Sequence, residues 1–126
     1  MKFMLMMNAP KGEGDWQVTS WPTEDLKAHI DFMIRFAKDL GEAGVLVGAE
    51  GLGPPSDARV VRAGKDGTPQ VTDGPFAEAK EQLAGYITVD CEREERALEI
   101  ARRWPDPRFG GAIEVRALMN ESGAEM

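Results

Sequence analysis

The chain has 126 residues, enough for one domain whose core needs neither disulfides nor a metal. Its 22 acidic and 15 basic residues give a formal net charge of −7 and are spread along the sequence, which argues against nucleic acid and anionic membranes as partners. A single cysteine, Cys91, permits no internal disulfide and fits a reducing cytoplasm, and no apolar run reaches the roughly 18 residues of a membrane span.

The N-terminal segment predicts a strand followed by a loop. Residues 2–8 are apolar on both alternating faces, which is typical of a central strand covered on both sides of its sheet. The apolar run is too short for the core of a signal peptide. Residues 9–22 hold several glycines and prolines and predict a loop, with Trp16 and Trp21 as its bulky apolar anchors.

An amphipathic helix is expected over residues 24–43, since apolar residues recur on one side and charged residues on the other. Thr23 stands where an N-cap is expected, and Gly44 where a C-terminal cap is expected. The apolar residues 45–50 then predict a second strand.

A β-hairpin is predicted next. Residues 58–63 and 68–72 read as two strands that flank Asp66 and Gly67, a pair typical of tight hairpin turns with positive φ.

The last third of the sequence predicts a strand over 82–90, a charged helix over 92–104 and a final strand over 112–119. Residues 120–126 are expected to form a disordered tail, so the single domain is placed at 1–119.

With the hairpin treated as an insertion, the order is strand, helix, strand, strand, helix, strand. This is the ferredoxin-like βαββαβ order of an α+β fold, with both helices on one face of an antiparallel sheet. The strands also offer apolar side chains to the other face of the sheet, so we expect a homodimer that packs sheet on sheet.

Three segments carry a family resemblance. They are VLVGAEGLGPP, VTDGPFAEAKEQLAGY and IEVRALM, and with them nearly the whole chain resembles the YCII-related family, specifically its DGPF-domain subgroup. The resemblance implies a ferredoxin-like fold assembled as a dimeric α/β barrel. It also implies a small enzyme whose active pair is a histidine on the first helix and an aspartate, which correspond here to His29 and Asp73.

His29 is the one histidine of the chain, and helical spacing places it beside Met33, Phe36 and Leu40 at the edge of the apolar stripe. It therefore faces the sheet. It is either a histidine satisfied by one hydrogen bond or a proton-transfer group, because imidazole suits that chemistry near neutral pH.

Asp73 precedes Gly74 and Pro75, so it is a natural turn residue. A carboxylate held in a stiff turn is also a preorganised partner that could orient an imidazole. Both roles are compatible with the sequence.

Glu50, Phe76 and Lys80 are assigned to substrate binding. Glu50 ends the second strand on the side of Leu46 and Gly48, where it either faces the dimer interior or is the polar end of a strand. Lys80 follows the turn that contains Phe76, and it could bind an anionic group or lie in solvent.

Cofactor and metal sites have no support in the sequence. One histidine and one cysteine cannot build a typical zinc site, and no phosphate-binding glycine motif is present. Two functions remain. One is a cofactor-independent lyase or isomerase in which His29, oriented by Asp73, moves a proton on a small cyclic or carbonyl-containing molecule. The other is a non-catalytic protein that binds a small ligand or acts as an accessory regulatory protein.

Overall fold

A computed structural model describes residues 1–10, 22–75, 81–104 and 112–119. In chain order its elements are β1 (Lys2–Pro10), α1 (Thr23–Glu42), β2 (Leu46–Gly51), the short 3-10 helix η2 (Pro55–Asp57), β3 (Arg59–Ala63), β4 (Pro69–Asp73), β5 (Glu81–Asp90), α2 (Glu94–Arg103) and β6 (Ala112–Ala117). The expected anchors Trp16 and Trp21 and the expected tail lie outside the described residues.

The main sheet has four strands in the order β2-β5-β1-β6, and every neighbouring pair is antiparallel. β1 lies at its centre, between β5 and β6, as the apolar character of both its faces predicts. The protein is thus an α+β structure with an antiparallel sheet and two helices, an arrangement compatible with a ferredoxin-like fold.

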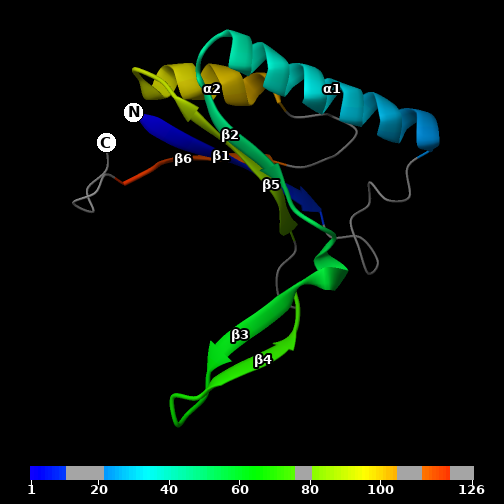
Figure 1. The fold of residues 1–126 in the computed structure, drawn as a ribbon, viewed down its shortest axis with the longest axis vertical. Coiled ribbons are helices and arrows are strands. Elements are labelled where there is room, and N and C mark those ends of the chain that lie inside the picture. The colour runs from blue at the N-terminus through cyan, green and yellow to red at the C-terminus, as the bar shows by residue number, and fades with distance from the viewer. Residues whose placement is uncertain (11–21, 76–80, 105–111, 120–126) are drawn as a thin grey trace.

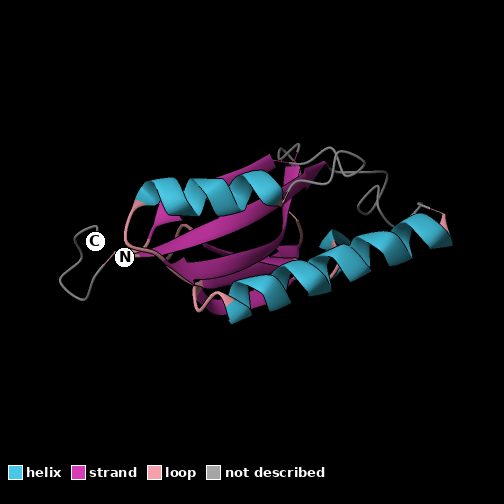
Figure 2. Cartoon of the chain, turned by 90° about the horizontal axis from the view of Figure 1, so that it is seen from above, coloured by secondary structure: helices cyan, strands magenta, loops and turns pink. Residues whose placement is uncertain are grey.

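Both helices cover the same face of this sheet (Figure 2). Along β1 the buried side chains Phe3, Leu5 and Met7 alternate with Met4 and Met6, which are only half-buried. Because successive side chains of a strand point to opposite faces, the first set faces the helices. We call the other side, which carries Met4 and Met6 and their cross-strand neighbours Thr88 and Tyr86, the helix-free face.

The core lies between the helices and the sheet. Trp104, at the end of α2, is 2% exposed and stacks on Phe36 of α1 with ring centroids 6.2 Å apart. Its indole N–H donates a hydrogen bond to the sulfur of Met33, so the end of α2 is tied to the middle of α1.

The start of α1 corrects one prediction. Thr23 is the first helical residue and not the N-cap, because the extended residue before the helix is Pro22. The Pro22 carbonyl accepts the Leu26 N–H at 3.0 Å, and within the described part of the chain no side-chain hydrogen bond caps this end of the helix. At the other end the C-cap residue is Ala43, and Gly44 follows it with φ of 77°, the left-handed conformation expected of a glycine that ends a helix.

Among the described strands, β3 and β4 pair only with each other, as a separate two-stranded sheet. Gly67 in the turn adopts φ of 85°, and the Thr68 N–H donates to the Asp66 carboxylate, which lowers the pKa of that group. We call residues 59–73 the arm. It extends from the main sheet in the direction away from the helices (Figure 1).

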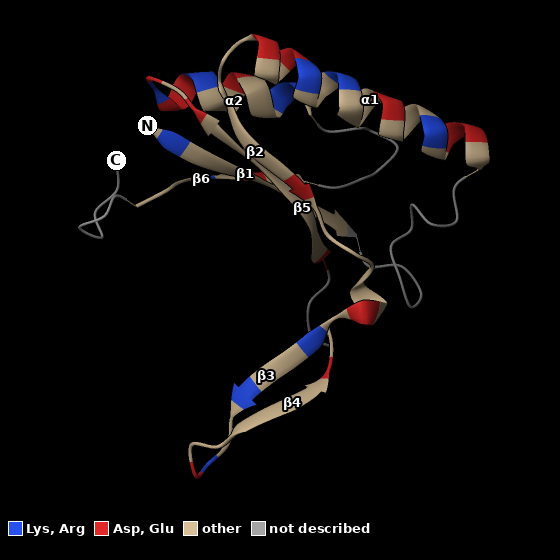
Figure 3. Ribbon diagram, viewed as in Figure 1, with Lys and Arg blue, Asp and Glu red and all other residues tan. Residues whose placement is uncertain are grey.

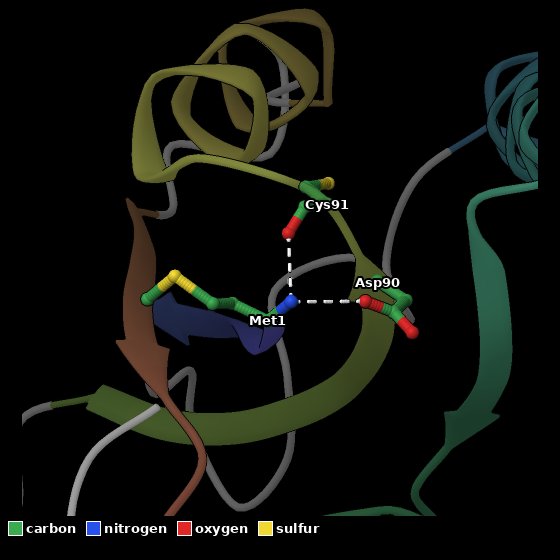
Figure 4. Close-up of polar contacts among 3 residues, drawn as sticks. All are labelled: Met1, Asp90 and Cys91. Atoms are coloured by element: carbon green, nitrogen blue, oxygen red, sulfur yellow. Dashed lines mark hydrogen bonds and ion pairs between the residues drawn. The ribbon is translucent and has the colours of Figure 1, made fainter.

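The chain terminus at Met1 is fixed against the end of β5. Its amine lies 3.1 Å from a carboxylate oxygen of Asp90 and 2.9 Å from the carbonyl oxygen of Cys91 (Figure 4).

Candidate functional site

A cleft of about 470 Å³ lies between α1 and the β2–β5 edge of the sheet. Most of its lining is apolar. The lining residues are Met7, Leu26, His29, Ile30, Met33, Ile34, Ala37, Ala49, Glu50, Gly51, Leu52, Ala84, Gly85, Tyr86, Ile87 and Trp104. A concave, mainly apolar site with few polar groups is the usual form of a small-molecule site.

One wall of the cleft is a stripe along α1. Leu26, His29, Ile30, Met33 and Ala37 recur at intervals of three and four residues, which places them on the same side of the helix. Sequence periodicity predicts this stripe, and it positions the imidazole of His29 among apolar side chains.

The floor of the cleft consists of small residues on β2 and β5. Ala49 and Gly51 lie beside Ala84 and Gly85, so the space that larger side chains would fill stays open. At Gly85 the strands are so close that a Cβ would come within 2.8 Å of the Glu50 carbonyl oxygen. This floor was not predicted from the sequence, although the segments of glycine and alanine at 48–51 and 84–85 are its signal.

His29 is half-buried in this wall. Three of the described residues that line the cleft are ionisable, namely His29, Glu50 and Tyr86, and of these His29 is the one on the helix. The imidazole can accept or donate a proton, so a molecule held against the floor would lie next to an acid/base group.

Glu50 also lines the cleft, but it is exposed. Its cross-strand neighbour is Tyr86, whereas the adjacent Ala49 is opposite the buried Ile87. Since side chains alternate along a strand, Glu50 and Tyr86 point toward the helix-free face and contribute backbone to the floor. Glu50 therefore shares its side of the sheet with Gly48, as expected, but not with Leu46, because the register shifts between Leu46 and Gly48 and Leu46 is opposite the buried Val89.

Asp73 lies elsewhere. It ends β4 at the base of the arm, its side chain is 92% exposed, and its carboxylate is 3.6 Å from the Arg59 guanidinium. It is not among the residues that line the cleft. Within one chain, the cleft that His29 lines therefore does not include Asp73, and β4, which ends at Asp73, lies in the arm away from α1 (Figure 1). Phe76 and Lys80, the other two residues assigned to the site, lie outside the described residues.

The described ranges contain no group of three or more His, Cys, Asp or Glu side chains placed to hold a metal ion. Within the same ranges, neither helix combines the length and the apolar character needed to cross a membrane.

Comparison with known proteins places the chain in a family. Residues 1–122 match the family model of the YCII-related domain. The chain belongs to this family. A relative from Rhizobium meliloti (strain 1021), Uncharacterized protein R00369, is 36% identical over 106 residues, which are 82% of this chain and 85% of the relative. The name of that relative assigns no activity, so the comparisons establish the family and leave the chemistry to the site.

Proposed function

We propose that the cleft holds a small, largely apolar molecule and that His29 transfers a proton on it without a cofactor. The observation that carries this proposal is the position of the one histidine of the chain, half-buried in the wall of an apolar cleft of about 470 Å³. The volume suits a molecule with one or two rings.

The chemistry follows from the surroundings of the imidazole. Neutral imidazole accepts a proton from a carbon next to a carbonyl group, and the electron pair of the broken C–H bond moves to the carbonyl oxygen as an enolate. The imidazolium then returns the proton to a different atom, which completes an isomerisation. Alternatively the enolate pair forms a C=C bond as the carbonyl is restored, and the leaving group departs with the electrons of its own bond and takes the imidazolium proton, which completes an elimination. Apolar walls strengthen the attraction between imidazolium and enolate, because they exclude water.

The proposal depends on His29 and not on a His29–Asp73 pair. The carboxylate of Asp73 is nearly fully exposed and already faces Arg59. A substitution of Asp73 therefore serves as the control for a substitution of His29, because only the latter should change proton transfer in the cleft.

Deuterium exchange of the α-protons of cyclohexanone in D₂O tests the proposal, since this exchange needs a base and no further substrate group. We expect the protein to accelerate the exchange above the buffer rate, His29→Gln to lose most of the acceleration, and Asp73→Asn to retain it. Equal rates for the wild type and His29→Gln would exclude proton transfer by this residue.

A non-catalytic binding role is the second candidate, and the apolar lining of the cleft favours it. In that case cyclohexanone or indole would shift the NMR signals of the Trp104 indole N–H and the His29 ring, while the exchange rate would equal that of buffer. The two measurements together therefore separate an enzyme from a binding protein.

Three further assignments belong to this proposal. The DGPF tetrad at 73–76 supports the DGPF subgroup, and the single cysteine supports the cytoplasm as its location. The half-buried Met4, Met6 and Tyr86 of the helix-free face support a homodimer in which two sheets pack as a dimeric α/β barrel. Light scattering tests the dimer, since a monomer mass at every concentration would exclude the barrel.

A further inference from the structure

We propose that the arm is a clasp for a second copy of the chain, and that one face of this β-ribbon packs against the partner. The proposal goes beyond the sheet-on-sheet dimer, because it assigns a separate interface element to residues 59–73. It depends on that dimer but not on the chemistry of the cleft.

The arm has one apolar face. In the β3–β4 register Val61 is opposite Val71, and Ala63 is opposite Pro69. Alternation places these four side chains on one side of the ribbon, beyond the Arg59–Asp73 ion pair. All four residues are exposed, Val61 and Val71 by 61% and 65%. The opposite side carries Arg62 and Gln70, a cross-strand pair that lies between these two pairs along the ribbon.

Nothing in the described part of the same chain packs on this apolar face. The extensive contacts of β3 are with β4, and those of β4 are with β3. An isolated two-stranded hairpin is marginally stable in water unless it packs against something else. The geometry of the arm therefore calls for a partner surface.

The size and position of the arm favour a second copy as that partner. A specific interface buries about 800 Å² on each side, which four small side chains cannot supply, so a second surface must take part. The arm extends away from the helices, on the same side of the main sheet as the helix-free face (Figure 1). The partner sheet of the proposed dimer would lie on that side. Packed sheets lie about 10 Å apart, and a five-residue strand spans roughly 17 Å, so the arm reaches past a partner sheet. A two-fold axis makes the contact reciprocal.

Charge supports the same partner. The arm has three cationic side chains, Arg59, Arg62 and Lys65, and two acidic ones, so its net charge is +1 (Figure 3). Because the whole chain carries −7, the remaining residues carry −8. The arm is thus attracted to the body of a second copy, although two whole chains repel each other.

A pair of neighbouring substitutions tests the clasp by analytical ultracentrifugation of the full chain. Val71→Glu puts a negative charge on the apolar face of the arm, and Gln70→Glu puts the same charge on the opposite face. We expect Val71→Glu to raise the dimer dissociation constant at least about tenfold, and Gln70→Glu to change it less than about threefold. Such a tenfold change corresponds to about 1.4 kcal/mol.

Equal dissociation constants for the two variants would overturn the clasp and leave the sheet-on-sheet dimer intact. A wild-type monomer at all concentrations would overturn both the dimer and the clasp, without bearing on cyclohexanone exchange in the cleft. Hydrogen exchange gives an independent readout on unaltered protein. Amides of the arm should be protected at dimer concentrations and lose protection on dilution, whereas protection independent of concentration would contradict the clasp.

Discussion

The indole N–H of Trp104 donates a hydrogen bond of 3.0 Å to the sulfur of Met33. Both residues also line the cleft, so this bond links the end of α2 to the helix wall that carries His29. The rigidity of the wall and the stability of the core therefore depend on the same contact.

Met33→Leu should lower the free energy of unfolding by about 1–2 kcal/mol. Leucine conserves the apolar volume, but the buried indole N–H loses its acceptor, and an unsatisfied buried donor is costly. Urea unfolding measures the change. Met119→Leu, at a residue that is 67% exposed, is the matched control and should leave the midpoint unchanged. A loss of the same size in both variants would mean that the hydrogen bond contributes nothing.

Gly85→Ala should destabilise the sheet by about 1–3 kcal/mol, since the new methyl group would lie 2.8 Å from the Glu50 carbonyl oxygen and force β2 away from β5. Gly48→Ala tests the same strand pair without the clash, because a Cβ there meets no atom within 4 Å. Thermal unfolding of the two variants should therefore differ clearly. Equal midpoints would contradict the close approach of the strands.

The sequence predicts the main elements because their patterns are local. Apolar residues alternate along β1 and recur with helical periodicity along α1, and in each element one side is buried as that pattern predicts. The Asp66-Gly67 pair likewise predicts the turn of the arm. The assignment of Thr23 as an N-cap was wrong, since residue type alone does not reveal that the extended residue is Pro22. Such boundary errors of one residue are common at helix ends.

The candidate site is less predictable, because it depends on distances between segments far apart in the sequence. His29 could be assigned to the sheet-facing side of α1 from spacing alone. The turn chemistry of Asp73 could not reveal that the arm carries this residue away from the cleft. The glycines and alanines of β2 and β5 are visible in the sequence, but only the register of the two strands shows that they lie side by side as one cleft floor.

Ala49→Leu should fill the cleft. Ala49 lies on the floor of the cleft and remains exposed, so a larger side chain can enter the open volume without displacing the core. We expect at least a tenfold weaker affinity for indole or cyclohexanone, measured by NMR titration, with no loss of stability. Ala28→Leu adds the same volume to the exposed side of α1 and should bind like the wild type. Unchanged affinity in Ala49→Leu would place the ligand elsewhere.

Cys91 should make the protein less stable at alkaline pH. The residue is 5% exposed, and burial raises the pKa of its thiol above the ordinary value of 9.0. The charge of Arg96 opposes this rise. Of the two charged groups that Figure 4 shows with Cys91, Asp90 adds to the rise and the Met1 amine opposes it. The folded protein therefore keeps the thiol proton at a pH where the unfolded chain has lost it. Because the folded state then binds more protons, the free energy of unfolding falls as pH rises through 9.0 and above.

Cys91→Ala lacks this titration and isolates its effect from that of the other groups. Urea unfolding of both proteins at several pH values from 7 to about 10.5, under a reducing agent, measures the difference in their free energies of unfolding. Below the ordinary thiol pKa the wild type should hold a constant advantage, because the alanine leaves a small cavity in the core. The advantage should shrink above that pKa, as the unfolded wild-type chain gains by ionising its thiol. Parallel curves over the whole range would mean that the thiol ionises equally in both states, which its position in the core opposes.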